Sequence, residues 1–457
     1  MGKTLNLEEI PYCPDSCELF NRIKDLPAAA FFDSAQPYSR RGRYDILTAS
    51  PLDEALPQLP PSAGEEQCKT YFGEMSRFHR ERYGDIQPAA QDLPFCGGIL
   101  GYIDYDAGSG LNKLPPHSLA NTTGRSSGAH LHAYEWAVIQ DHLLRKSVLV
   151  ALPSVSSRRR AALLSRLSRP VALAGSFFRL LGSFQSNLTD AAYKSAFEKI
   201  KDYITAGDCY QVNLAQRFSA VFEGDPWSAY KSLRGAAAAP FSAYITLPDN
   251  GAVISLSPER FISLHGQHVE ASPIKGTSPR HSDAHADENA ARELCDSEKD
   301  RAENLMIVDL LRNDLGRSCV PGSIHVDRLF ELQSYPSVHH LVSTISGELR
   351  PERSAWELLR DSFPGGSITG APKRRAMEII AELEPHPRQV YCGSMMYVSA
   401  DGRMDSNIAI RTLLCQEGNI HCWGGGGIVA DSQWHSEYRE TFDKVQKYLQ
   451  ILEKSSA

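Results

Sequence analysis

A change of hydrophobic period near Asp190 constrains the fold of this chain more than any other feature. Apolar residues first recur at the spacing of one helical face, until Gly207 ends the pattern: Tyr193, Phe197, Ile200, Tyr203 and Ile204. Residues 210–218 then alternate like a β-strand, and more strands are expected near 241–247, 252–256, 260–264 and 267–271. Helices are expected at about 286–315, 372–383 and 435–453. Runs of strands mixed with long helices favour an α+β fold over a doubly wound sheet.

The chain divides into three stretches. Residues 1–152 alternate short apolar runs with turn residues, which is typical of strands joined by hairpins. Within them, residues 107–129 are rich in Gly, Ser, Asn and Pro and indicate a loop. Residues 153–189 form a basic, Ser-rich connector, in which residues 158–160 suit the polar start of a surface helix. Residues 190–457 carry the candidate functional motifs.

Composition narrows the class of protein. The 457 residues are 42% apolar and 23% charged, as in an ordinary globular protein. The net charge of −7 predicts no nucleic-acid partner, and we expect neither a membrane span nor a signal peptide. Ten scattered cysteines without a CxxC pair predict reduced thiols in the cytoplasm, with neither a zinc site nor a disulfide frame.

Lys275 is the first candidate for catalysis. It lies between apolar Ile274 and Gly276, at an expected corner between a strand and a turn. A lysine held in a pocket can have a lowered pKa and act as a nucleophile. The alternative is a solvated turn lysine, which is the commoner fate of such a residue.

Two helices carry further candidates. Glu303 lies on the flank of an expected core stripe formed by Leu305, Val308, Leu311 and Leu315, from which its carboxylate can reach the edge of a pocket. The alternative is a solvated acid near Arg301. On the C-terminal helix, the expected buried stripe is Tyr438, Phe442, Val445 and Leu449. Glu437, Glu440 and Lys444 share another face, where Glu440 and Lys444 could equally form a surface ion pair.

Two glycine runs and one arginine complete the candidates. Residues 365–370 have the spacing of a phosphate loop but lack the following Lys and Ser or Thr, so we exclude nucleotide binding. The amides before the next helix suit a carboxylate better. Residues 424–427 permit close backbone approach to a ligand, or form only a tight hairpin. Arg411 offers a bidentate carboxylate clamp, or is a charge at a sheet edge.

Five segments, in order along residues 190–450, give the chain a family resemblance: Ser257–Phe261, Pro273–Thr277, Lys299–Asp309, Phe363–Lys373 and Gly424–Ser432. The chain resembles the chorismate-utilising enzymes, and among them those that aminate chorismate at C4. The resemblance implies two large, mostly antiparallel sheets packed as a sandwich, with helices outside and the active site between the sheets. It also implies that the N-terminal stretch is interleaved with the rest, and that residues 190–457 form the catalytic region.

The resemblance assigns roles to particular residues. Lys275 is the implied nucleophile at C2 of chorismate, and Glu259 the implied acid that protonates the leaving hydroxyl; from the residues alone, Glu259 could instead pair with Arg260. Glu303 and Glu440 are the implied ligands of Mg²⁺, a hard ion that prefers oxygen. The implied substrate-binding residues are Thr369, Tyr391, Arg411, Gly425, Gly426 and Lys444.

The resemblance also implies partners. No glutaminase and no Cys/His/Glu triad can be recognised, so ammonia must come from solution or from a separate glutamine amidotransferase subunit. Relatives bind tryptophan between the sheets. The matching residues here are Ser34, Tyr44, Pro240, Phe241 and Ser242, which could equally be ordinary core packing.

The expected activity is therefore Mg²⁺-dependent amination of chorismate to 4-amino-4-deoxychorismate, on the route to p-aminobenzoate and folate. The first alternative is an anthranilate synthase component, but those relatives carry alanine at the position of Lys275. Isochorismate and salicylate synthases carry a lysine near the position of Gln211, which this chain lacks, so ammonia is the expected nucleophile. A third alternative is an inactive regulatory subunit that binds chorismate or tryptophan.

Overall fold

The structure is a computed structural model that describes residues 3–39, 42–60, 63–89, 92–114, 128–170, 177–335 and 338–454. Its largest element is a 13-stranded antiparallel sheet. The strands along its path are, in spatial order, β1 (Asn6–Ile10), β7 (Lys146–Ala151), β6 (Trp136–Asp141), β3 (Tyr44–Thr48), β2 (Ala30–Asp33), β11 (Phe241–Leu247), β12 (Gly251–Ser257), β21 (Thr412–Gln416), β22 (Asn419–Ile428), β10 (Gln211–Gly224) and β18 (Gly370–Ala371). Two short strands also pair with β10: β8 (Phe178–Leu180) and β9 (Gln185–Ser186).

A second antiparallel sheet has nine strands. Its path runs through β15 (Ile274–Pro279), β17 (Val338–Glu348), β14 (His268–Ala271), β13 (Arg260–His265), β20 (Met404–Asn407), β19 (Ser394–Ser399), β4 (Gly98–Ile103) and β5 (Ala129–Tyr134), and β16 (His325–Ser334) pairs with β17. The helices are α1 (Ser16–Phe20), α2 (Glu65–Tyr83), α3 (Ala107–Leu111), α4 (Ser157–Leu167), α5 (Asp190–Thr205), α6 (Pro226–Ala237), α7 (Ala284–Asp296), α8 (Glu298–Gly316), α9 (Ala355–Ser362), α10 (Lys373–Leu383), α11 (Trp434–Asp443) and α12 (Gln446–Lys454), with a 3-10 turn at Gly366–Ile368.

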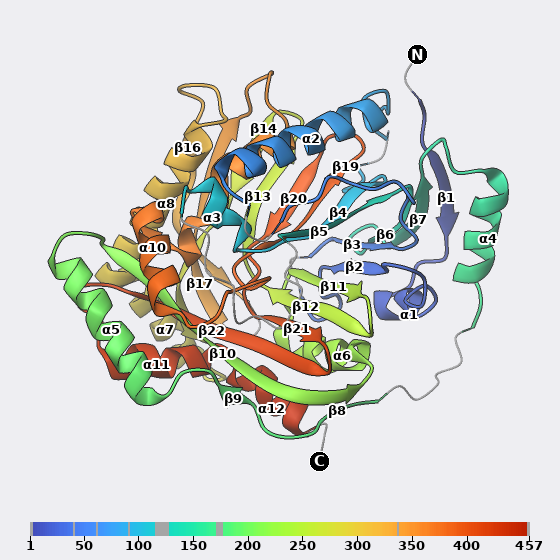
Figure 1. Cartoon of the computed structure of the whole chain (residues 1–457). Helices are drawn as coiled ribbons and strands as arrows, with labels where there is room; N and C mark the ends of the chain where they lie inside the picture. The colour runs from blue at the N-terminus through green and yellow to red at the C-terminus, as the bar shows by residue number, and fades with distance from the viewer. Residues whose placement is uncertain are drawn as a thin grey trace.

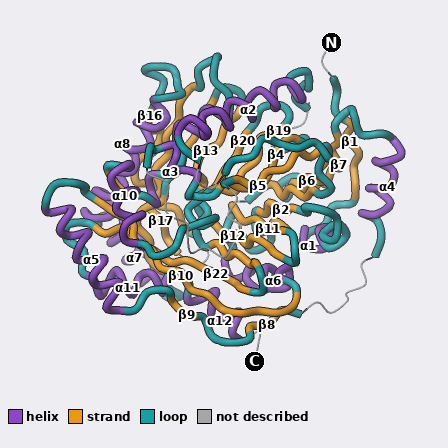
Figure 2. Tube along the Cα trace, in the orientation of Figure 1, coloured by secondary structure: helices purple, strands orange, loops and turns teal. Residues whose placement is uncertain are grey.

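One hydrophobic core lies between the two sheets. It joins Phe31 and Val138 of the first sheet to Ile99 and Ile262 of the second, all fully buried. The strands fill the middle of the molecule, and helices such as α5, α10 and α11 lie at its periphery (Figures 1 and 2). The predicted α+β sandwich of two antiparallel sheets is therefore confirmed.

The change of period near Asp190 produces the predicted helix and strand. Thr189 caps α5 by accepting a hydrogen bond from the amide of Ala192, and its buried face packs on β10. This contact forms a second, smaller core, in which α5 contributes Tyr193, Phe197 and Ile200. The strands predicted at 241–271 are β11 to β14.

The N-terminal strands are distributed over both sheets. β2 pairs with β11, and β4 pairs with β19, so elements far apart in sequence lie side by side. The limits 1–152, 153–189 and 190–457 remain predictions. The connector contains α4, and the loop expected at 107–129 begins with α3; residues 115–127 and 171–176 lie outside the described residues. No described helix is both long and apolar enough to cross a membrane.

Two long helices that the sequence predicted as continuous are each broken, so those predictions were wrong. Residues 286–315 divide into α7 and α8 at Ser297, whose backbone is extended and whose hydroxyl accepts a hydrogen bond from the amide of Asp300. Serine is among the residues preferred at an N-cap, so a new helix can begin at this position. Residues 435–453 divide into α11 and α12 between Asp443 and Gln446.

The predicted core stripe of α8 was also wrong at one position. Leu305 is 46% exposed, whereas Ile307, which the predicted stripe omits, is fully buried. The reason lies one residue before Leu305. Asn304 is buried and accepts a hydrogen bond from the hydroxyl of Ser343 on β17, which turns its face of the helix toward the sheet.

Candidate active site

Lys275 lies within β15, not at the corner that the sequence predicted. It is opposite Leu341 of β17, and the register shifts immediately after it. Gly276 makes this bulge with a φ of +79°, and a Cβ there would lie 3.0 Å from Oδ1 of Asp300. The bulge re-aims the lysine, as bulges near functional sites do. Its ammonium donates a hydrogen bond of 3.2 Å to the carbonyl oxygen of Ser367.

Glu259 lies beside Lys275 and is almost completely buried, at 5% exposure. Burial raises the pKa of its carboxyl to about 7, although hydrogen bonds from Ser367 and from the amide of Ile274, and the charges of Lys275 and Arg411, act in the opposite direction. The alternative pairing with Arg260 does not occur, because that guanidinium is bound by Asp405 and Glu270. Glu259 is thus a carboxylic acid poised to be protonated near neutral pH.

The same cluster perturbs the lysine. Burial lowers the pKa of Lys275, and the ammonium of Lys444 adds to this effect. The carboxylates of Glu303, Glu259 and Glu440 raise it and so offset part of the shift. The geometry therefore brings together five residues that the sequence singled out from four separate segments, since Glu440 and Lys444 share one helix.

Glu303 and Glu440 approach from two different helices. Burial raises the pKa of Glu303, with Lys275 opposing. Burial acts in the same direction on Glu440, but the ammonium of Lys444, 2.6 Å away, acts together with Lys275 and Lys299 and holds the pKa of Glu440 low. Glu437 is the additional acid here: its pKa is raised by burial and by the charge of Glu440.

These carboxylates meet the second glycine run. A Cβ at Gly426 would lie 3.2 Å from Oε2 of Glu437 and 3.3 Å from Oε1 of Glu440. Glycine at this position therefore lets β22 approach both acids closely. Within the described residues, no three His, Cys, Asp or Glu side chains gather closely enough to hold a metal ion alone. An ion at Glu303 and Glu440 would need water or substrate oxygen to complete its shell.

β22 also leaves one edge open beside this cluster. It pairs with β10 along its whole length, but with β21 only over residues 419–422. Among the described strands, none covers the other edge of residues 424–428. Lys444 reaches this edge and donates a 2.8 Å hydrogen bond to the carbonyl oxygen of Gly425. The predicted surface ion pair between Glu440 and Lys444 is present, and it lies at the open edge.

The first glycine run forms a tight buried loop before α10. Thr369 is fully buried, and its hydroxyl bonds to the carbonyls of Gly365 and Gly366, so this side chain holds the loop together. Ser367 presents its carbonyl to Lys275 and its side chain to Glu259. Sequence reasoning gave no role to Ser367; its place inside the glycine run was the signal for it.

Arg411 and Tyr391 are the two remaining residues that the sequence predicted for substrate binding. Arg411 precedes β21 with a φ of +52°, a left-handed conformation, so the expected position within a strand was wrong. Such strain in a residue other than glycine is often found at functional sites. Arg411 bonds to Tyr448 and its charge acts on Glu259. Tyr391 is buried and stacks on Trp423, with ring centres 5.9 Å apart.

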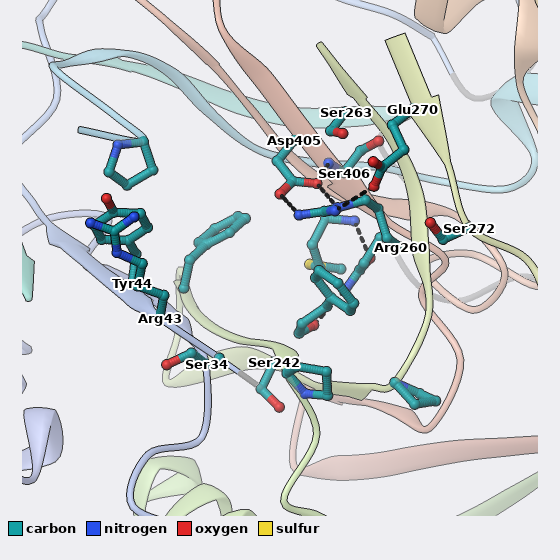
Figure 3. A pocket seen from close by; sticks show the side chains of 18 of the residues that line it. Ser34, Arg43, Tyr44, Ser242, Arg260, Ser263, Glu270, Ser272, Asp405 and Ser406 are labelled. Atoms are coloured by element: carbon teal, nitrogen blue, oxygen red, sulfur yellow. Dashed lines mark hydrogen bonds and ion pairs between the residues drawn. The ribbon is translucent and has the colours of Figure 1, made fainter. Parts of the chain in front are cut away.

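The five residues expected at a tryptophan site all line one cavity of about 780 Å³ between the sheets. Figure 3 shows Ser34, Tyr44 and Ser242 on one side of it and Arg260, with Asp405 and Glu270, on the other. Pro258 and Ile274 also line the cavity, next to Glu259 and Lys275 in sequence. The charged side of the cavity was not predicted.

Comparison with known proteins identifies the family of this chain. Residues 60–450 match the family model described as chorismate binding enzyme. The chain is 43% identical over 461 residues to aminodeoxychorismate synthase component 1 of Salmonella typhimurium, covering 99% of this chain and all of that protein. It is 45% identical to the Escherichia coli protein of the same name, with 95% of each chain covered.

Solved structures agree. The structure of anthranilate synthase component I from Streptococcus pneumoniae matches with a TM-score of 0.73 at 28% identity, over 90% of this chain and 93% of that one. The menaquinone-specific isochorismate synthase MenF from Escherichia coli matches with a TM-score of 0.72 at 17% identity, over 99% and 95%, which shows a shared fold alone. Family model, relatives and fold lead to one conclusion: this chain belongs to the family of chorismate-binding enzymes.

Proposed function

We propose that this chain aminates chorismate at C4 and forms 4-amino-4-deoxychorismate, as the synthase component that receives ammonia from a separate glutamine amidotransferase. The observation that carries the proposal is the contact of Ser367 with both Lys275 and Glu259, which sets a buried amine beside a buried acid. The names of the relatives at 43% and 45% identity support the same activity.

Chemically, the neutral amine of Lys275 would add to C2 of the ring. The ring double bond shifts, and the C4 hydroxyl takes the proton of Glu259 and departs as water. The ionised Glu259 can then accept the proton that the bound lysine nitrogen must lose. Ammonia attacks C4 and the bond between C2 and lysine breaks, while Glu259 returns its proton to the lysine nitrogen and so restores the neutral amine of Lys275. The new ammonium at C4 then gives one proton to Glu259, which restores the acid. The balance is chorismate plus ammonia giving the amino product plus water.

The remaining residues suit a dicarboxylic substrate. Arg411 and Lys444 supply two positive groups for the two carboxylates. The open strand edge at Gly425 and Gly426 would let the substrate approach the backbone closely. Thr369 would act by holding the loop, and Tyr391 by forming an apolar wall with Trp423.

Glu303 and Glu440 would hold Mg²⁺, since they offer hard oxygen ligands near the same lysine. When bound, the ion supplies charge neutralisation for a substrate carboxylate. The cavity lined by Ser34, Tyr44, Pro240, Phe241 and Ser242 is a candidate for tryptophan, because it combines apolar walls with polar groups between the sheets.

The decisive experiment is to incubate the chain with chorismate, Mg²⁺ and ammonium, and to identify the product by mass. An amine at C4 with the enolpyruvyl group retained supports the proposal. Release of anthranilate and pyruvate would instead indicate an anthranilate synthase. Binding without turnover would indicate a regulatory subunit.

A second experiment addresses Lys275. Enzyme quenched with chorismate in the absence of ammonia should carry a mass adduct on the peptide that contains Lys275. Lys275→Ala should lose the adduct and react more slowly. The control is Lys194→Ala, which removes an exposed lysine that pairs with Glu198 on α5. An adduct that persists in Lys275→Ala would show that another group is the nucleophile.

A further inference from the structure

A buried lysine that the proposed chemistry does not use lies behind the active-site loop. Lys373 begins α10, and its side chain is only 9% exposed. Its ammonium donates three hydrogen bonds: 2.6 Å to Oδ2 of Asp314, 2.9 Å to the carbonyl of Ser362 and 2.7 Å to the carbonyl of Pro364. All three donors are satisfied, and two of them hold backbone immediately before the first glycine run.

The partner carboxylate belongs to the helix that carries Glu303. Asp314 is 1% exposed and lies 11 residues after Glu303 on α8, about three helical turns, so both project from the same face. The loop is pressed against this helix: a Cβ at Gly366 would lie 2.3 Å from Cδ2 of Leu310. Lys373 therefore ties α8, the loop and α10 together.

The other end of the loop is held separately. Arg388 is 1% exposed, pairs with Glu384, and donates a 2.8 Å hydrogen bond to the carbonyl of Ile368. Ser367, which contacts both Lys275 and Glu259, lies between these two anchors.

We propose that Lys373 is a positioning residue, whose ammonium fixes residues 362–364 to α8 and thereby sets Ser367 against Lys275 and Glu259. This inference rests on the proposed function of those two residues. Because Arg388 still holds Ile368, loss of Lys373 frees one end of the loop and leaves the rest of the fold in place. A displacement of about 1 Å in a reacting group can cost roughly 100-fold in rate.

The test separates the effect of Lys373 on the position of the loop from its effect on the stability of the fold. Lys373→Met leaves Asp314 buried without its cation and should lower both stability and kcat. Lys373→Met combined with Asp314→Leu removes both charges, and an apolar pair of similar volume often restores the stability of a buried ion pair. In the double variant we expect stability near that of the wild type, kcat still lower by roughly 100-fold, and a KM for chorismate within about threefold of wild type, because the groups that bind the substrate carboxylates are unchanged.

Arg374→Met is the matched control, because it removes an exposed cation from the same turn and should leave kcat unchanged. Recovery of kcat together with stability in the double variant would show a purely structural role and overturn the proposal. A double variant that fails to fold would overturn it in the same way. Failure of the proposed function is distinguished from failure of this inference by the product of the wild-type enzyme. If the proposed function is wrong, the wild-type enzyme gives no C4 amine at all.

Discussion

At the scale of the residue, the most informative group is the buried carboxyl of Glu259. Its pKa is raised to about 7 by burial, so at neutral pH roughly half of the molecules hold the proton that the leaving hydroxyl needs. The pKa of Lys275 is lowered by burial, so its reactive neutral form gains population as pH rises. The two trends oppose each other and should give a rate that passes through a maximum with pH.

We predict that Glu259→Gln lowers kcat by roughly 100- to 10,000-fold, the usual contribution of a general acid. The kcat that remains in the variant should also no longer fall as the pH is raised above neutral. Above about pH 7 the wild-type acid is increasingly ionised and cannot donate, whereas glutamine does not titrate. The measurement is kcat from pH 5.5 to 10, with the exposed Glu223→Gln as control. An unchanged alkaline decline in Glu259→Gln would assign it to another group.

The structural consequence of the same burial is a second prediction. Above the unfolded pKa of about 4.5, Glu259 ionises freely in the unfolded chain but at a cost in the folded one. The ionisation of Glu259 therefore destabilises the fold progressively as pH rises from about 4.5 to 7, and the destabilisation is complete above about pH 7. Glu259→Gln should raise the melting temperature at pH 8 and leave it unchanged near pH 4. A decrease at pH 8 would show that the ionised carboxylate is compensated in the folded state.

At the scale of the element, the close approach of β22 to Glu437 and Glu440 depends on glycine. Gly426→Ala would place a methyl group 3.2 Å from Glu437 and 3.3 Å from Glu440, closer than most contacts of a Cβ. The carboxylates would have to shift by a few tenths of an ångström. We expect a severalfold rise in the Mg²⁺ concentration that gives half-maximal rate, with little loss of stability. Gly182→Ala, which meets no atom within 4 Å, is the control. An unchanged requirement for Mg²⁺ would place the metal elsewhere.

The break between α7 and α8 gives the second prediction at this scale. The Ser297 hydroxyl accepts the hydrogen bond of the Asp300 amide at the start of α8. Ser297→Ala should lower the free energy of unfolding by about 1 kcal/mol, the usual cost of losing an N-cap. Denaturant titration measures it, with Ser232→Ala, an exposed helical serine, as the comparison. Equal stability of the two variants would show that tertiary packing alone holds the break.

At the scale of the whole molecule, the chain is matched over nearly its full length by relatives named as component 1. We predict that the purified chain uses ammonium but not glutamine. Addition of a glutamine amidotransferase subunit should make glutamine a substrate, and a subunit with its catalytic cysteine replaced is the control. Turnover with glutamine in a preparation free of that subunit would contradict the requirement for a partner.

The local sequence was sufficient for several elements. The strands β11 to β14, helix α5 and helix α10 follow from the period of their apolar residues, because each buries one face against a core. The break at Ser297 also had a local signal, a serine three residues before an acid, but the helical period on both sides concealed it.

The chemistry of the candidate site was decided only by tertiary structure. The family motifs identified Lys275 and Glu259, but the raised pKa of the acid and the lowered pKa of the amine come from burial between segments far apart in the chain. Ser367, which joins them, lies 92 residues after Lys275. The exposure of Leu305 was likewise set by its neighbour Asn304, which accepts a hydrogen bond from the hydroxyl of Ser343 on another element. Period and motif are local properties of a sequence, whereas desolvation and hydrogen bonding between distant residues exist only after the chain has folded.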